Sequence, residues 1–404
     1  MDKKHRKILM MVLKLGIAVG LMGWVVSQSF WRDYVTAKDG KSYALLGTQT
    51  FPDGRLEYVV AEGRLWWASQ RNLSVDDLMP FMDSETHLVL ENGKPIYIQP
   101  GVATSIRYID VRLVILALGG FLLSNLMVSV RWWFLLRIQD IRIKLWEATR
   151  LTFLGIFCNI FMPSTVGGDV VKAYYVAKHT PRKAAVLVSI FVDRILGLTE
   201  LTMLAGVVVA IVLLCGIESF ASLHKAVYAV LIVFGLVIGL LTFLLSSRFR
   251  RLFHLQKIYQ RLPIAHHIAA AGDAAALYRK RLPSLVKAIG ITFGSHVVWV
   301  GSIALIGMSL PAMAAKVPWY NFFVYIPLIY IIAAVPITPG AVGVLEKLYV
   351  VFFAAVSPST VLAMALLARF VPLVWALPGI LVAVTGPKLP KAADMEAELE
   401  GEEK

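Results

Sequence analysis

Six long apolar runs constrain this chain more than any other feature. Each approaches the ~20 residues that a helix needs to cross the hydrocarbon core of a bilayer. The chain is 58% hydrophobic and only 16% charged, which is too apolar for the surface of a soluble protein of 404 residues. The sequence therefore predicts an all-α polytopic membrane protein. The runs cover 8–26, 112–130, 187–214, 225–246, 286–310 and 361–384.

The first apolar run, 8–26, follows a basic N-terminus and has the composition of a signal-peptide core. It is longer than such a core, and no small-residue cleavage pattern follows it. We expect 1–27 to be an uncleaved anchor helix.

The net charge of +14 is unevenly distributed. Residues 248–287 carry nine Lys/Arg against one acid and 172–183 carry four against none, whereas 28–110 carries eight against eleven. Positive charge concentrated in alternate short loops is typical of cytoplasmic loops. It predicts cytoplasmic N- and C-termini in a cell inner (plasma) membrane, and it argues against nucleic-acid binding. Cys158 and Cys215 lie in or beside apolar runs, so no disulfide or metal site is expected.

Residues 28–110 differ from the rest of the chain and predict a small β-rich domain outside the membrane. Asn92-Gly93 is a strong hairpin-turn signal, because both turn residues must accept positive φ. At this size the domain is marginally stable alone. The predicted strands are Tyr43–Thr48, Leu56–Ala61, Leu65–Ser69, His87–Leu90 and Ile96–Ile98.

Two segments do not fit simple spans. Segments 131–150 and 172–183 are both basic and should both be cytoplasmic, yet only 151–171 lies between them. We therefore expect a re-entrant helical hairpin, whose irregular backbone must be buried in protein or line a wet cavity. Segment 321–356, broken at Pro336 and Pro339-Gly340, predicts a second one that opens the other way.

The two breaks share a pattern. Each contains Pro-x-x-Val-Gly followed within three residues by an acid. Gly167 precedes Arg194 by 27 residues, and Gly343 precedes Arg369 by 26. With opposite predicted orientations, this is an inverted-topology repeat, which places a substrate site near the midplane between broken helices.

These residues also carry a resemblance to a known family. Over about 112–385 the chain resembles the membrane region of the lysylphosphatidylglycerol synthase/flippase family. The resemblance rests on Asn159 before Pro163, on Gly167-Gly168-Asp169, on Asp193-Arg194, on Pro339-Gly340 with Gly343 and Glu346, and on Arg369. It implies a bundle with re-entrant helices that moves a lipid between leaflets. Only about twenty residues follow 384, so we expect no aminoacyl-transferase domain.

The leading functional hypothesis is a lipid flippase or transporter for a phospholipid or polyprenyl-phosphate-type lipid, with a cavity between the re-entrant helices. Charged side chains at a helix centre cost about 2.5–3.5 kcal/mol on insertion scales, so they persist where something offsets them. The two arginines would pass a phosphodiester headgroup, balanced by two acids. Internal salt bridges that pin the bundle are the structural alternative. The substrate-binding candidates are Asn159, Pro163, Gly167, Gly168, Asp169, Asp193, Arg194, Glu200, Pro339, Gly340, Gly343, Glu346 and Arg369.

Other functions stay open. A polytopic lipid-linked glycosyltransferase would use acids on the first external loop, where Asp33 and Asp39 lie. An assembly component would recruit a partner through 28–110, and a homo-oligomer is also open. We find no nucleotide-binding loop and expect no enzyme activity, cofactor or metal. The remaining domains are 111–385, the transport-like membrane domain, and 386–404, an acidic cytoplasmic tail.

Overall fold

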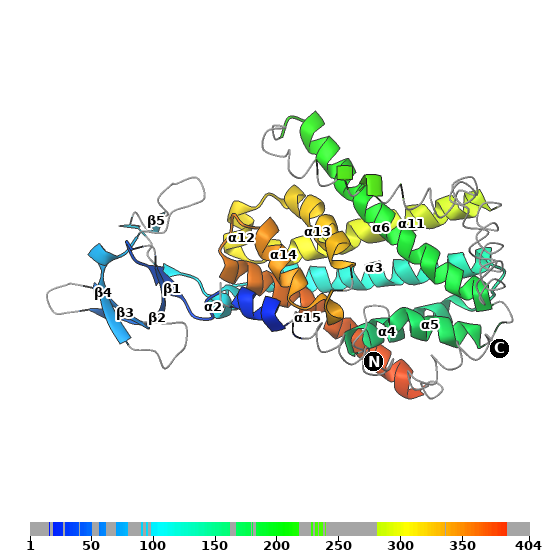
Figure 1. The fold of residues 1–404 in the computed structure, drawn as a ribbon, viewed down its shortest axis with the longest axis horizontal. Coiled ribbons are helices and arrows are strands. Elements are labelled where there is room, and N and C mark those ends of the chain that lie inside the picture. The colour runs from blue at the N-terminus through cyan, green and yellow to red at the C-terminus, as the bar shows by residue number, and fades with distance from the viewer. Residues whose placement is uncertain are drawn as a thin grey trace, which may run out of the picture. The chain divides into compact units, whose positions relative to one another are not determined.

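The computed structural model of the chain is mostly helical, with a small antiparallel sheet near the N-terminus (Figure 1). The chain divides into two compact units. Unit 1 comprises Met1–Leu116, Ala304–Asn321 and Ile337–Arg369, and unit 2 comprises Ala117–Ile303, Phe322–Pro336 and Phe370–Lys404. The structure describes residues 16, 19–26, 29–39, 41–50, 56–61, 70–79, 90–91, 94–95, 98–161, 167–178, 180, 183–217, 228, 231–232, 234–236, 239, 281–335 and 337–385.

The five-stranded sheet belongs to unit 1 and has the order β4-β3-β2-β1-β7. Alternation of apolar residues along β3 turns Tyr58 and Val60 inward, where they pack with Val35 and Leu73. The sheet confirms the predicted strands Tyr43–Thr48 and Leu56–Ala61, and β1 and β4 were not predicted. The strands are β1 Tyr34–Thr36, β2 Ser42–Thr50, β3 Leu56–Ala61, β4 Gln70–Ser74 and β7 Ile98–Gln99. A 3-10 turn, η1, follows β4 at Val75–Asp77.

The predicted hairpin occurs, but its second strand was placed wrongly. Strands β5 (Leu90–Glu91) and β6 (Lys94–Pro95) pair antiparallel, with Glu91 opposite Lys94, so two residues are left for the turn. The partner strand therefore begins at Lys94. Ile98 instead belongs to β7, which pairs with β1.

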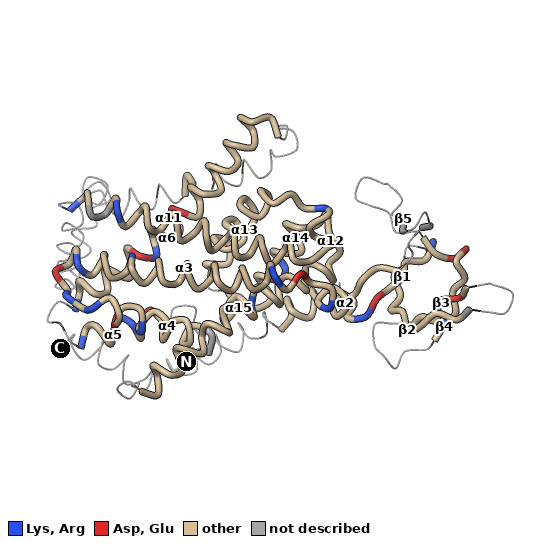
Figure 2. Tube along the Cα trace, turned by 180° about the vertical axis from the view of Figure 1, so that it is seen from behind, with Lys and Arg blue, Asp and Glu red and all other residues tan. Residues whose placement is uncertain are grey.

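Four helices are long and apolar enough to cross a membrane by length and composition. They correspond to four of the six predicted runs, and most of their length is free of charged residues (Figure 2). These helices are α3 Val111–Ile138, α6 Lys183–Leu214, α11 Leu282–Met308 and α15 Pro358–Thr385.

Small residues set the approach of the long helices within unit 2. A Cβ at Gly120 of α3 would press on the Ser302 hydroxyl of α11. Nearby, the Ser124 hydroxyl of α3 donates to the Ser295 carbonyl of α11 at 3.0 Å. Close backbone approach and hydroxyl-to-carbonyl bonds are the usual means of helix association in apolar surroundings.

The first break joins two short helices that lie side by side, α4 (Leu145–Phe161) and α5 (Gly167–Ala177) (Figure 1). A Cβ at Gly168 would overlap the Gly155 backbone, so glycine is required for this approach. With 11 residues, α5 is about 16 Å long and cannot span a bilayer. The re-entrant placement of the pair stays a prediction, and Pro163 lies outside the described residues.

The second break follows α13 (Trp319–Ala333) and precedes α14 (Val344–Phe352). Between them, η2 (Pro339–Ala341) includes Gly340 at φ 59°, and Gly343 has φ 78°. Positive φ favours glycine, so these two glycines allow the chain to turn into α14. Two further short helices are α2 Val102–Arg107 and α12 Pro311–Lys316.

Two basic residues were interpreted wrongly from the sequence. Arg131 was counted in the basic segment 131–150 that follows the apolar run 112–130, but α3 continues to Ile138 and Arg131 is buried against Asp193. Lys172 was counted in a cytoplasmic loop, but it lies inside α5 and is buried against Asp169. In both cases a carboxylate on the folded chain replaces water or lipid headgroups as the partner.

Several predictions fall outside the described residues. They concern the strand Leu65–Ser69, the turn residues Asn92-Gly93, the acidic tail 386–404, most of the apolar runs 8–26 and 225–246, and most of the basic segment 248–287.

Candidate functional site

A buried charge triad lies at the start of α5. The Asp169 carboxylate receives Lys172 Nζ at 3.0 Å on Oδ1 and the Arg194 Nε hydrogen bond at 2.5 Å on Oδ2. The side chains of Asp169 and Lys172 are 7% and 9% exposed, whereas that of Arg194 is 52% exposed. With one acid and two bases, the triad has a net charge of +1, and its half-exposed member is the Arg194 side chain.

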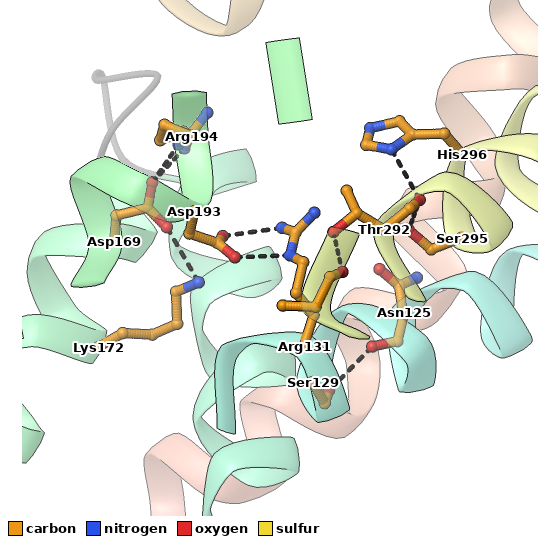
Figure 3. A network of polar contacts seen from close by, with 11 residues as sticks. Asn125, Ser129, Arg131, Asp169, Lys172, Asp193, Arg194, Thr292, Ser295 and His296 are labelled. Carbon is orange, nitrogen blue, oxygen red and sulfur yellow. Dashed lines mark hydrogen bonds and ion pairs between the residues drawn. The ribbon is translucent and has the colours of Figure 1, made fainter. Parts of the chain in front are cut away.

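The backbone around the triad follows from local sequence. Asn159 near the end of α4 accepts the Gly168 N–H through Oδ1 at 2.8 Å, which satisfies one donor in the first turn of α5. Lys172 Nζ also lies 5.0 Å from the centre of the Trp132 ring. Figure 3 shows the lysine pointing at the Asp169 carboxylate.

The second break carries a related pair in unit 1. Glu346 accepts the Gly343 N–H through Oε2 at 2.7 Å and pairs through Oε1 with Arg369. The Arg369 guanidinium also donates to the carbonyls of Gly340 and Ala341 at 3.2 and 3.1 Å. All three of its nitrogens are therefore engaged, and the arginine holds the turn that opens α14.

The two breaks thus repeat one arrangement. The acid is the third residue of its short helix, and the arginine comes from the next long helix of the chain. The two arginines differ in the number of their hydrogen-bond acceptors. Among the described residues, Arg194 bonds only the Asp169 carboxylate, whereas Arg369 bonds the Glu346 carboxylate and two backbone carbonyls. The predicted pairing of arginine and acid is present in both, and the inverted relation of the two segments stays a prediction.

A family model for the lysylphosphatidylglycerol synthase TM region matches residues 100–379. The match covers more than half of the chain and agrees with the resemblance expected from the broken segments. The chain belongs to this family. No curated protein matches the chain.

Family membership and the four long apolar helices show that this is a multi-pass membrane protein. The family is a membrane domain, and membership agrees with a role related to membrane lipids. The matched region contains every predicted substrate-binding residue, including both arginine–acid pairs.

A further polar cluster lies within the family region, in unit 2. Asp193 of α6, one of the predicted site residues, is bound bidentately by Arg131 of α3, with 2.6 Å to Oδ1 and 2.8 Å to Oδ2 (Figure 3). Glu200, seven residues after Asp193 and therefore on the same face of α6, is 2% exposed. The structure therefore separates these two carboxylates: Asp193 is paired with a cation, whereas Glu200 has no hydrogen-bond partner among the described residues.

Sequence reasoning missed Arg131, Lys172 and His296 as polar members of these clusters. Lys172 stands three residues after Asp169, a spacing that puts both on one helix face. That signal was available. The partner of Arg131, Asp193, comes from a distant helix, and nothing local in the sequence indicates it.

The two acids of the glycosyltransferase alternative both have structural partners. Asp33 Oδ1 accepts the Gly101 N–H at 2.9 Å, and Asp39 Oδ1 accepts the Lys41 N–H at 2.9 Å. The first bond ties the start of the sheet region to the residue that precedes α2, and the second shapes the turn before β2. Among the described residues, no group of three or more His, Cys, Asp or Glu side chains is arranged to hold a metal ion.

Proposed function

We propose that this protein moves an anionic lipid, a phospholipid or a polyprenyl-phosphate-type lipid, between membrane leaflets. The observation that carries the proposal is the triad at the start of α5. It has a net charge of +1, and its one accessible member is a guanidinium. A phosphodiester headgroup supplies the single negative charge that this site lacks.

The chemistry of the triad suits a phosphate. A guanidinium binds two phosphate oxygens at once, and the positive end of the α5 dipole adds to the attraction. Asp169 and Lys172 would orient Arg194 from behind, leaving its exposed edge for the lipid. Because no nucleotide-binding loop is found in the sequence, we propose movement without ATP hydrolysis.

The test is lipid translocation by the purified full chain in liposomes of phosphatidylethanolamine and phosphatidylglycerol. Labelled phosphatidylglycerol, phosphatidylcholine and a polyprenyl phosphate would be compared by chemical quenching of the outer leaflet. We expect faster movement of the anionic lipids. Loss of one charge-assisted hydrogen bond, about 1.5 kcal/mol, predicts a roughly tenfold slower rate in Arg194→Lys.

Arg142→Ala is the matched control, because Arg142 is an exposed arginine outside both breaks. It should keep the wild-type rate. Asp33→Asn should also keep it, and complete loss there would favour the glycosyltransferase alternative. Equal rates for neutral and anionic lipids, unchanged by Arg194→Lys and Arg194→Ala, would contradict the proposal.

A further inference from the structure

A buried carboxylate without a partner lies near the middle of α6. Glu200 is 2% exposed, and neither of its oxygens has a hydrogen-bond partner among the described residues. A carboxylate in such surroundings is strongly disfavoured in its ionised form unless it is paired. An ionisable group within an apolar spanning helix is a candidate for function by default.

The cation that interacts electrostatically with the Glu200 carboxylate is Arg131, on α3. Arg131 is already bound bidentately by Asp193, which lies two turns before Glu200 on the same face of α6. One arginine thus serves two carboxylates. The cluster is neutral when Glu200 holds a proton and carries one uncompensated negative charge when it does not.

The His296 ring of α11 borders the same side of α6. Its Nδ1 donates to the Thr292 carbonyl oxygen at 3.0 Å, because that oxygen can only accept. A Cβ added at Gly197, one turn before Glu200, would lie 3.9 Å from Nε2. A titratable imidazole therefore borders the face that carries Glu200.

Other ionisable groups near the cluster belong to separate contacts. Arg194 is the residue after Asp193, but its guanidinium belongs to the Asp169–Lys172–Arg194 triad. On the far side, the His296 ring meets Trp299 edge-on, and Trp299 in turn meets Tyr330 of α13. Among the described residues, none of these groups donates a hydrogen bond to Glu200.

We propose that Glu200 is a proton-binding site that couples proton movement to lipid translocation. The Glu200 carboxylate takes up one proton from water on one side of the membrane and releases it on the other, with no other bond made or broken. The coupling part rests on the proposed function, and the proton-binding part does not.

Arg131 is the side chain that links protonation of Glu200 to the lipid site. With Glu200 protonated, Arg131 pairs with Asp193 alone, as in the structure. With Glu200 ionised, the arginine is attracted to both carboxylates and its hold on Asp193 weakens. Since Asp193 directly precedes Arg194 on α6, this shift reaches the residue that we propose contacts the headgroup. A two-state element biased from both sites is the requirement for coupling.

The first experiment measures protonation without any transport. Infrared difference spectra of the purified full chain would be recorded over a pH series for wild type, Glu200→Gln and Glu147→Gln. We expect wild type and Glu147→Gln to share a protonated-carboxyl C=O band that disappears at high pH and is absent in Glu200→Gln. Identical spectra in all three proteins would overturn the site.

The melting temperatures of variants distinguish a proton-binding Glu200 from a Glu200 that is ionised and held in a structural ion pair. Glu200→Gln and Glu200→Met keep the cluster neutral, so both should melt at or above the wild-type temperature in detergent. Asp193→Asn strands Arg131 and should melt well below it. Destabilisation by both Glu200 variants as large as that of Asp193→Asn would mean that Glu200 is an ionised structural partner, and the proposal would fail.

The second experiment measures coupling in proteoliposomes with a pH-sensitive dye inside. An imposed pH gradient should change the wild-type rate of labelled phosphatidylglycerol movement several-fold, whereas the rate in Glu200→Gln should be the same with and without the gradient. A response to a sodium gradient, with no response to the pH gradient, would overturn the proposal of proton coupling and indicate coupling to a metal cation. If the infrared band of protonated Glu200 is present but no lipid moves at all, the proposed function is refuted and Glu200 remains a proton-binding site. A band with gradient-independent movement would refute the coupling alone.

Discussion

Arg194 and Arg369 make the same kind of pair with very different freedom. Arg194 is half exposed, and its partner Asp169 keeps a second cation, Lys172, at 3.0 Å. Arg369 is the only charged partner of Glu346 among the described residues, and Glu346 is 1% exposed. At the residue scale, one arginine is available for a ligand and the other supports a turn.

This contrast predicts opposite responses to alanine. Arg369→Ala leaves a buried carboxylate without its cation and frees the Gly340 and Ala341 carbonyls, so we expect a loss of about 3 kcal/mol in the free energy of unfolding. Arg194→Ala should lose less than about 1 kcal/mol, because Lys172 still neutralises Asp169. Denaturant titration in mixed micelles measures both values.

Arg142→Ala again serves as the baseline for removing an exposed arginine. Equal losses for Arg194→Ala and Arg369→Ala would show that both arginines are structural, and Arg194 would lose its special position in the proposed site.

At the scale of elements, the hairpin of α4 and α5 depends on glycine. The backbones of Gly155 and Gly168 are so close that a Cβ at Gly168 overlaps the carbonyl of Gly155. A Cβ at Gly155 is less severe, at 3.3 Å from the Gly168 carbonyl oxygen. The hairpin is also what brings Asn159 to the first turn of α5.

Gly168→Ala should therefore separate the two helices, at a cost of about 1–3 kcal/mol in unfolding free energy. Lipid translocation should fall with it, because Asp169 and Lys172 move with α5. Gly155→Ala should have a smaller effect on both quantities. Unfolding in mixed micelles and the liposome assay provide the two readouts.

Gly290→Ala is the control, since Gly290 is an exposed helical glycine of α11 with nothing within 4 Å of an added Cβ. Alanine is the better helix former, and this variant should be as stable as wild type or slightly more stable. A Gly168→Ala protein that matches Gly290→Ala in both assays would disprove the tight hairpin.

At the scale of the whole molecule, the route of the chain through the membrane is testable by labelling. In a background without Cys158 and Cys215, we expect Lys178→Cys to react only from the cytoplasm. Asp76→Cys and Ala315→Cys should react only from outside. All three positions are exposed in the structure. This expectation for Lys178→Cys follows from the predicted re-entrant hairpin, in which α4 and α5 return to the side from which they started.

The measurement is modification by a membrane-impermeant maleimide in intact cells and in inverted vesicles. Labelling of Lys178→Cys from outside would mean that 145–177 crosses the membrane once. The re-entrant interpretation and the inverted repeat would then both be wrong, whereas the family assignment would stand.

The sequence alone determined the membrane class, the four long helices, two strands of the sheet, the family and the positions of both breaks. These follow from local properties, namely the length and hydropathy of runs and the glycines and prolines that end helices. The matched spacing of acid and arginine also anticipated the Asp169–Arg194 and Glu346–Arg369 pairs.

Only the tertiary structure decided which charges meet. Arg131 and Asp193 are 62 residues apart and pair because α3 packs against α6. The packing of α5 against α3 buries Lys172 beside Trp132. Glu200 is left without a hydrogen bond among the described residues. Because a buried charge takes whichever partner the helix packing brings within reach, its partner depends on the arrangement of helices and cannot be inferred from local sequence.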